Sequence, residues 1–205
     1  MPTTLLSSLT EKEKSNAVKR LIDESTPRDD FFLMTVLSIL MATLGLMLDS
    51  VAIIIGSMLI APLLSPILSL SLGVVMADTK LILRSFFTIL KAVVYSVPAA
   101  AILALIFSTQ TNLGVELTAE IITRTEPSLT FAVVALIAGI AASFALIKPQ
   151  LSATLPGVAI SVAIIPPLAV TGIGLAQLDA GLIADSLILF VVNAISIMFA
   201  SLIVF

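Results

Sequence analysis

The chain has 205 residues, of which 59% are hydrophobic and only 11% are charged, and its mean hydropathy is +1.21. This composition predicts an integral membrane protein, and the formal net charge of −3 comes with no basic patch that would bind nucleic acid. Cysteine and histidine are absent, which excludes disulfides, thiolate chemistry and the usual zinc, haem and copper ligands, so we expect no metal or cofactor.

The first thirty residues are polar and contain no apolar stretch followed by a small-residue cleavage site, so we expect them to stay on the protein. Thr10 and Glu13 have the spacing of a capping box. We interpret 10–25 as a short amphipathic surface helix within an arm, 1–30, and a partly ordered tail is the alternative. The narrow apolar stripe of this helix comprises Ala17, Val18, Leu21 and Ile22.

Six later segments are long and apolar enough to cross a bilayer, which takes about 20 residues each. We therefore predict an all-α, polytopic membrane protein with two three-helix membrane repeats, 31–107 and 129–205, joined by a long loop, 108–128. The predicted spans are 31–48, 51–76, 86–107, 129–147, 153–176 and 183–205.

The basic residues predict the orientation. With six crossings the arm shares a side of the membrane with two short loops, and Arg124 is the one basic residue on the other side. This asymmetry follows the positive-inside pattern, so we expect a protein of the inner (plasma) membrane with both termini cytoplasmic and 108–128 external. The basic side holds Lys12, Lys14, Lys19, Arg20, Arg28, Lys80, Arg84 and Lys148.

Two of the predicted spans contain paired prolines. "IGSMLIAPLLSPIL" covers 55–68, and "GVAISVAIIPPLAVTGIG" covers 157–174. Setting Pro62 against Pro167 also matches three apolar pairs, and "DTKLILRS" at 78–85 resembles "DAGLIADS" at 179–186. The chain therefore reads as two repeats, and they must be inverted because each has an odd number of crossings. Inverted repeats with broken helices are a recurring plan of secondary transporters.

Each proline lacks an N–H and leaves a carbonyl four residues earlier without its helical donor. In lipid these carbonyls must meet a neighbouring helix, a hydroxyl, water or a bound cation. Free amides at a half-helix start could hold an anion instead, so the sign of the ligand stays open. The candidate solute or ion site comprises Gly56, Ser57, Met58, Pro62, Ser65, Pro66, Ser69, Ser161, Val162, Ala163, Pro166, Pro167, Thr171 and Asn193.

Structural roles compete with each of these assignments. Prolines in membrane helices often only kink them, and hydroxyls return hydrogen bonds to their own backbone or join neighbouring helices. Asn193 lies deep in the sixth predicted span, where an interhelical hydrogen bond is the first interpretation and substrate contact the second. Gly139 and Ser143 suggest close packing only. Asp49 is expected to cap a helix, with a coupling role as the alternative.

Beyond these patterns, "DSVAIIIGSMLIAPLLSPILSLSLGVVMAD" and "LPGVAISVAIIPPLAVTGIGLA" resemble the signature of the membrane-protein family known as domain of unknown function 389, found in bacteria and archaea. The resemblance covers 30–205 and implies the six-helix membrane assignment more than any function. Many family members carry a soluble domain beside the membrane region. Only a thirty-residue arm is expected here, which puts regulation through such a domain in doubt.

Together these patterns predict a transporter of a small solute or ion, working through a site between the broken second and fifth helices. An ion channel is the alternative, and a membrane scaffold that binds a partner is another. We expect no enzyme, because the chain has neither histidine nor an HExxH motif. Broad apolar faces also predict a homo-oligomer, with a dimer favoured.

Overall fold

The computed structural model describes residues 15, 18, 19, 21, 22, 26, 28–111, 117–125, 128–147 and 164–205. Every regular element in this part of the chain is a helix, which confirms the all-α class. The helices are α2 (Asp29–Met47), α3 (Val51–Ile60), α4 (Leu64–Val75), α5 (Thr79–Thr111), α6 (Ala119–Ile122), α7 (Leu129–Ile147), α9 (Ile165–Gln177) and α10 (Ala180–Val204).

Four helices are long and apolar enough to cross a membrane by themselves: α2, α5, α7 and α10. A fifth candidate is the pair α3 and α4, which passes the same test together but is bent by 50° between its halves. The protein is therefore a multi-pass membrane protein. Helix α5 begins at Thr79, earlier than the predicted 86, because Asp78 accepts hydrogen bonds from the first-turn amides of Lys80 and Leu81 and so starts the helix before the basic residues.

The break in the second span lies where the prolines predict it. Helix α3 ends at Ile60, and Ala61 has an extended backbone with φ −73° and ψ 124°. A residue before proline is pushed out of the helical region by the proline ring, so Pro62 accounts for this conformation. In the fifth predicted span, α9 begins at Ile165 with Pro166 and Pro167 in its first turn. The remainder of that span, 153–163, lies outside the described residues.

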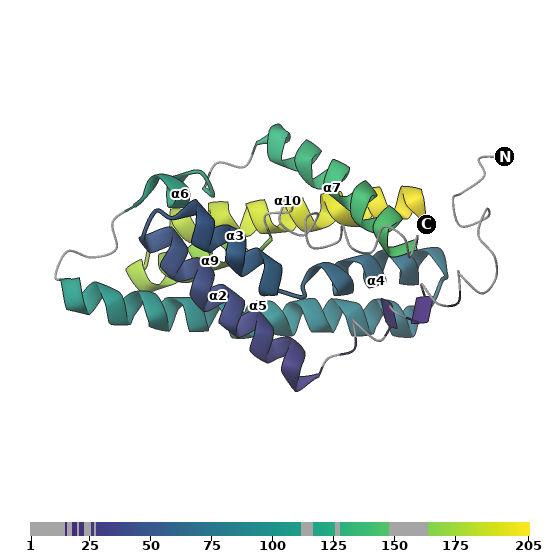
Figure 1. The fold of residues 1–205 in the computed structure, drawn as a ribbon, viewed down its shortest axis with the longest axis horizontal. Helices are drawn as coiled ribbons and strands as arrows, with labels where there is room; N and C mark the ends of the chain where they lie inside the picture. Colours follow the sequence, from purple (N-terminus) through teal and green to yellow (C-terminus); the bar gives the residue numbers. More distant parts are fainter. Residues whose placement is uncertain are drawn as a thin grey trace.

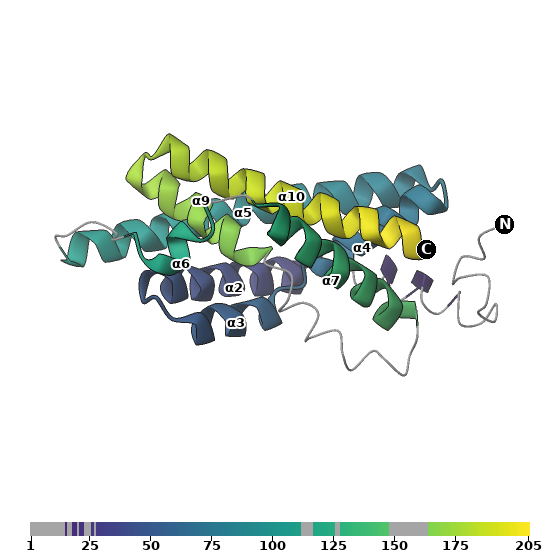
Figure 2. The ribbon, with the colours of Figure 1, turned by 90° about the horizontal axis from the view of Figure 1, so that it is seen from above.

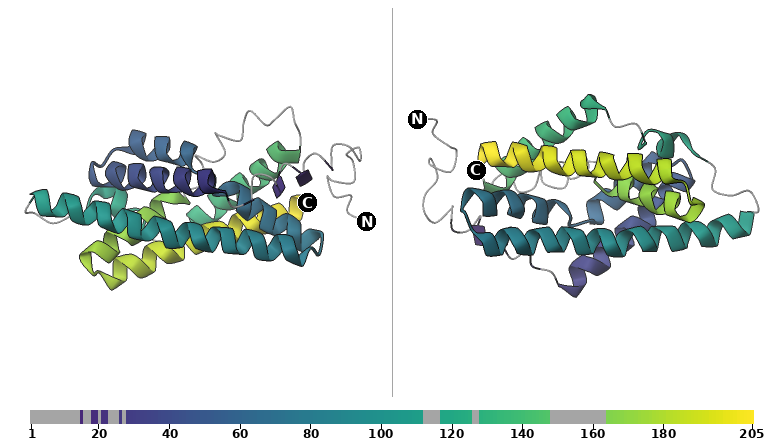
Figure 3. Two further views of the ribbon diagram at one scale, coloured as in Figure 1. Left: turned by 90° about the horizontal axis from the view of Figure 1, so that it is seen from below. Right: turned by 180° about the vertical axis from the view of Figure 1, so that it is seen from behind.

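Helices α5 and α10 each contact three other helices. Helix α5 packs against α2, α4 and α9, and α10 packs against α4, α7 and α9. Figure 1 shows α4 along α5, with the short connection from α3 near the middle of α5. Helices α5 and α10 run in opposite directions, and so do α4 and α9, as Figures 1 and 3 show.

Three helix–helix corners share one geometry. In each, the residue two before the second helix has a positive φ, and the residue after it donates its amide to a glycine carbonyl five positions earlier, the pattern of a Schellman motif. The glycines are needed because a Cβ at Gly73 or Gly174 would lie 3.1 Å from the amide nitrogen of Ile82 or Ile183. The glycine, positive-φ and amide-donor residues are Gly45, Asp49 and Ser50; Gly73, Ala77 and Asp78; and Gly174, Leu178 and Asp179.

The outer faces of the helices are apolar, as contact with a bilayer requires. Large side chains such as Ile102 and Ile137 are more than half exposed, while small ones such as Ala92 and Ala104 are fully buried between helices. In a soluble protein such a surface would aggregate, but lipid is as apolar as these side chains. Helix α5 is the least covered span, with 28% of its apolar window buried against 44% for α2, α7 and α10.

The described residues of the amino-terminal arm pack against the bundle. Residues 15, 18, 19, 21 and 22 are helical, and Leu21 is buried, with 1% of its surface exposed. The Ser69 hydroxyl donates to the Leu21 carbonyl at 3.0 Å, and the Arg84 guanidinium donates to the Ile22 carbonyl and the Thr26 hydroxyl. Of the apolar stripe predicted for the arm, Leu21 belongs to the buried core and Val18 and Ile22 pack against that core, while Ala17 lies outside the described residues.

Candidate functional site

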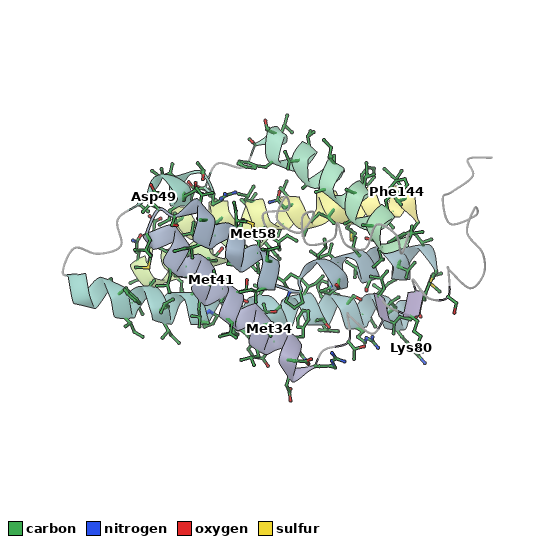
Figure 4. The ribbon with its side chains drawn as sticks, in the orientation of Figure 1. Met34, Met41, Asp49, Met58, Lys80 and Phe144 are labelled. Atoms are coloured by element: carbon green, nitrogen blue, oxygen red, sulfur yellow. The ribbon has the colours of Figure 1, made fainter. Side chains whose placement is uncertain are left out.

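A pocket of about 340 Å³ opens at the break between α3 and α4. Two predicted site residues line it, Pro62 and Ser65, together with the start of α2. Figure 4 shows Met34, another lining residue, on the first half of α2. The full lining is Thr26, Arg28, Asp30, Phe31, Met34, Ile60, Pro62 and Ser65.

The pocket contains a pair of charges that the sequence pattern did not single out. Arg28 and Asp30 form an ion pair at 3.1 Å, and their side chains are 66% and 64% exposed. So exposed a pair contributes little to stability. The exposure of both charges indicates instead that water can reach the mouth of the pocket. The only signal in the sequence was the position of these charges directly before the first apolar run.

Helix α3 ends in the pocket wall with carbonyls that have lost their helical donors. The Ser38 hydroxyl of α2 donates to the Ser57 carbonyl at 2.6 Å, and the Ser57 hydroxyl donates to the Ile54 carbonyl at 2.6 Å. A residue of α2 thus satisfies the carbonyl that Ala61 would otherwise cover. The Met58 carbonyl has no helical donor, because residue 62 is a proline without an N–H.

At the start of α9 the polar side chains bind one another. Pro166 and Pro167 are buried. The Thr171 hydroxyl lies 2.9 Å from the Pro167 carbonyl and 2.8 Å from the Ser186 hydroxyl of α10. Ser186 also donates to the Leu182 carbonyl at 2.6 Å. These contacts give Thr171 a structural role in joining α9 to α10.

Asn193 lies on α10 at the level where α4 and α9 begin. Thr171 and Ser186 are paired across the antiparallel helices α9 and α10, and counting one residue per 1.5 Å along both places Asn193 opposite Ile164. Ser71 of α4 donates to the Met198 carbonyl of α10 at 3.2 Å, and the same count along this parallel pair places Asn193 opposite Pro66. The Asn193 side chain is 2% exposed.

Helix α5 packs closely against α9. A Cβ at Gly172 would lie 2.4 Å from the Ala100 Cβ and 2.8 Å from the Val97 carbonyl oxygen, so α9 and α5 are in close contact there. One turn earlier on the same face of α5, Ser96 is fully buried and its hydroxyl has no hydrogen-bond partner. Figures 1 and 2 show the start of α9 beside the end of α3, and the two helices are in contact.

The other predicted site residues have different surroundings. A Cβ at Gly56 would lie 2.8 Å from the Met41 methyl, the end of a flexible side chain of α2, so Gly56 faces α2. Ser69 binds the arm rather than the break. Ser161, Val162 and Ala163 lie outside the described residues.

The corners after α4 and α9 have a spacing along the chain that differs from the pairing of Pro62 with Pro167. Gly73 and Gly174, and Asp78 and Asp179, are 101 positions apart, which pairs Pro66 rather than Pro62 with Pro167. The contact between Ser71 and the Met198 carbonyl then corresponds to the contact between Gly172 and the Val97 carbonyl.

Asp49 binds an amide of α6, whereas α3, which follows it in the chain, has no side-chain cap hydrogen bond. The Asp49 carboxylate accepts the amide of Glu120 at 3.0 Å, and the Thr118 hydroxyl donates to the Leu46 carbonyl at 2.7 Å. Helix α6 is thereby held on the corner between α2 and α3, away from the breaks. Among the described residues no group of three or more histidine, cysteine, aspartate or glutamate side chains could hold a metal ion.

Comparison with known proteins identifies the family of the chain. Residues 58–199 match the family described as a domain of unknown function, DUF389. An uncharacterized protein of Methanocaldococcus jannaschii is 32% identical over 216 aligned positions, which cover 100% of this chain and 65% of that protein. The chain thus spans less than two thirds of the length of this relative. No solved structure matches. The match over most of the chain confirms the resemblance, and the protein belongs to the DUF389 family.

Proposed function

We propose that the protein is a membrane transporter that moves a small solute or ion through a site between its two broken spans. The observation that carries the proposal is the 50° break between α3 and α4, beside which a pocket of about 340 Å³ opens next to the exposed ion pair of Arg28 and Asp30. Unsatisfied backbone is tolerated in a membrane only where protein covers it or where it lines a water-filled cavity. A break beside an open pocket meets the second condition.

An inverted repeat is part of this proposal. Helices α2 and α7 have 19 residues each, and the corners after α4 and α9 have the same geometry 101 positions apart. The paired helices α4 and α9, and α5 and α10, run in opposite directions (Figure 3). Six spans in two inverted repeats, with α9 as half of the broken fifth span, account for these features and resemble the plan of many secondary transporters.

We also propose that the protein lies in the inner (plasma) membrane with both termini on the cytoplasmic side. Lys80 and Arg84 lie at the end of the bundle where α4 meets α5, whereas Asp49 and Glu120 lie at the opposite end, and Figure 4 shows Lys80 and Asp49 at these two ends. The basic end faces the cytoplasm under the positive-inside rule.

The test is flux in proteoliposomes, screened with fluorescent indicators for cations and anions and with labelled uncharged solutes. Replacing Pro62 and Pro66 with alanine restores the N–H groups that a continuous helix donates to the carbonyls of residues 58 and 62. The span should then straighten. We expect flux to fall at least tenfold while the melting temperature holds or rises, because a continuous helix satisfies its own backbone.

Pro98 provides the matched control. It lies inside α5, is exposed, and lines the shallow apolar groove between α2 and α5 rather than the break. Pro98→Ala should retain flux. Normal flux from a well-folded Pro62→Ala/Pro66→Ala protein would show that the break does not form the transport site.

A further inference from the structure

An apolar groove of about 600 Å³ runs between α2 and α5 on the outer surface of the bundle. Its lining residues form one stripe on each helix, at the three- and four-residue spacing of a single helix face. The ring of Phe32 packs edge-on against the ring of Tyr95, with the ring centroids 5.4 Å apart, so the two helices are in contact along the groove. The lining residues are Phe32, Leu33 and Val36 of α2 and Val94, Tyr95, Pro98, Ala99 and Ile102 of α5.

A charged residue lies at the same end of each stripe. Asp29 lies three residues before Phe32, and Lys91 lies four residues before Tyr95, so both lie about one turn before the ring contact. Helices α2 and α5 run in the same direction here, as Figure 1 shows, and both charged side chains are exposed. The groove therefore has an apolar body and a polar end with one charge of each sign, one from each helix.

These two charges need partners from outside the bundle. Both lie within candidate membrane spans, where an ionisable side chain is costly unless it is paired or reaches the headgroup level. The ion pairs among the described residues involve neither Asp29 nor Lys91. Long side chains point back toward the start of their own helix, so Lys91 extends along α5 toward the end of the bundle that carries Lys80. Lipid headgroups on that side of the membrane are within its reach.

The groove has the length of one lipid leaflet. From Lys91 to Ile102 helix α5 rises about 16 Å, at about 1.5 Å per residue. Half of the hydrocarbon core of a bilayer is about 15 Å thick. An acyl chain that lies along the groove contacts its apolar walls, whereas an unfilled groove forfeits these dispersion contacts. An occupant with a polar end and an apolar chain of this length is a membrane lipid.

From this arrangement we infer that the groove binds a phospholipid with a phosphoethanolamine headgroup, whose phosphate pairs with Lys91 and whose ammonium pairs with Asp29. A carboxylate distinguishes this headgroup from phosphocholine, because only the primary ammonium has N–H groups for charge-assisted hydrogen bonds. A phosphoglycerol headgroup offers a phosphate to Lys91 but no cation to Asp29. The groove shares no lining residue with the pocket at the break, so the inference does not depend on the proposed transport function.

Native mass spectrometry of the purified protein in detergent measures the bound lipid directly. The protein is incubated with equal amounts of phosphatidylethanolamine, phosphatidylglycerol and phosphatidylcholine that carry the same acyl chains. We expect phosphatidylethanolamine to be retained at least fivefold more than either of the others. Glycerophosphoethanolamine, which has the headgroup without the chains, should not displace it, because the groove holds the chain.

Two variants connect the retained lipid to the groove. Lys91→Gln should reduce retention of phosphatidylethanolamine at least fivefold, and Asp29→Asn should remove its preference over phosphatidylglycerol. Lys80→Gln and Asp185→Asn are the matched controls, since they make the same changes of charge at exposed residues outside the groove. Both controls should keep the amount and the preference of the lipid bound by the unmodified protein.

Each outcome decides the proposal. A preference that Asp29→Asn removes, with retention that Lys91→Gln weakens, supports the phosphoethanolamine site. Equal retention of the three lipids, or equal losses in Lys91→Gln and Lys80→Gln, overturns it, because the lipid would then be unselected bilayer lipid. A lipid-free dimer that oxidation cross-links through Ile102→Cys also overturns it, because a second copy would then fill the groove. None of these measurements is a flux, so failure here leaves the transport proposal to its own test.

Discussion

Gly172 sets how closely α9 approaches α5. A Cβ there would lie 2.4 Å from the Ala100 Cβ, 2.8 Å from the Val97 carbonyl oxygen and 3.0 Å from the Ala101 amide nitrogen. Two of these three atoms belong to the backbone and cannot turn away. Small residues at such crossings let membrane helices make the van der Waals contacts on which their association depends. Helix α9 can therefore lie this close to α5 because residue 172 has no Cβ.

Gly172→Ala should lower the free energy of unfolding by about 1–3 kcal/mol, the range for overpacking in a core. The measurement is thermal or denaturant unfolding in detergent. Gly181→Ala is the matched control, because the nearest atom to its Cβ is an aspartate oxygen at 3.3 Å at the exposed start of α10. Alanine favours a helix over glycine, so this control should hold or gain stability. Equal effects of the two substitutions would contradict the packing role of Gly172.

The pair α3 and α4 is maintained by a helix outside it. Pro62 forces Ala61 out of the helical region, which ends α3 at Ile60. The Ser38 hydroxyl of α2 donates to the Ser57 carbonyl, in the last turn of α3, at 2.6 Å. A side chain of α2 therefore stabilises the end of α3 at the break.

A double-mutant cycle tests this arrangement. Ser38→Ala alone should destabilise the protein by about 1–3 kcal/mol, because it leaves the Ser57 carbonyl buried without its side-chain donor. In a Pro62→Ala background Ala61 can become helical and cover that carbonyl, so the same change should cost little. The coupling energy, measured by unfolding of all four proteins, should approach the single Ser38→Ala effect. Additive effects would mean that Ser38 does not compensate for the break.

The distribution of charge along the whole bundle predicts its orientation. The chain has no natural cysteine, so single cysteines report their own side of the membrane. A cysteine at Ser15 or Lys148 should be protected from an impermeant thiol reagent in intact cells, and one at Asn112 should react. Reaction at Ser15 with protection at Asn112 would reverse the orientation proposed here.

The exposed face of α5 predicts self-association. This helix buries the smallest share of its apolar window, and large side chains such as Phe86, Val94 and Ile102 are at least half exposed along it. A second copy could cover this face, and twofold symmetry is the commonest arrangement. We expect native mass spectrometry in mild detergents to give the mass of a dimer. A monomer in every detergent would contradict this expectation.

Much of this architecture could be predicted from the sequence, because apolar run length and proline position are local signals. The span at 129–147 and the break at Pro62 are examples. The alignment of the two halves was displaced by four residues. The match of 78–85 with 179–186 has a spacing of 101 positions, whereas the pairing of Pro62 with Pro167 has 105, and a shift of about one helical turn keeps the same face apolar, so the proline pairing by itself did not reveal the difference. Ser38 and Ser96 were missed because their importance depends on which helices are neighbours in space.

The central claim is that solute or ion passes the break between α3 and α4, and cysteine accessibility during flux tests it most directly. Met34 lines the pocket and is 46% exposed, whereas Leu37, on the same helix and 47% exposed, does not line it. In proteoliposomes that carry Met34→Cys, an impermeant, bulky methanethiosulfonate reagent should label the cysteine and block flux. Leu37→Cys should remain unlabelled and active. Full flux after complete labelling of Met34→Cys would contradict the claim.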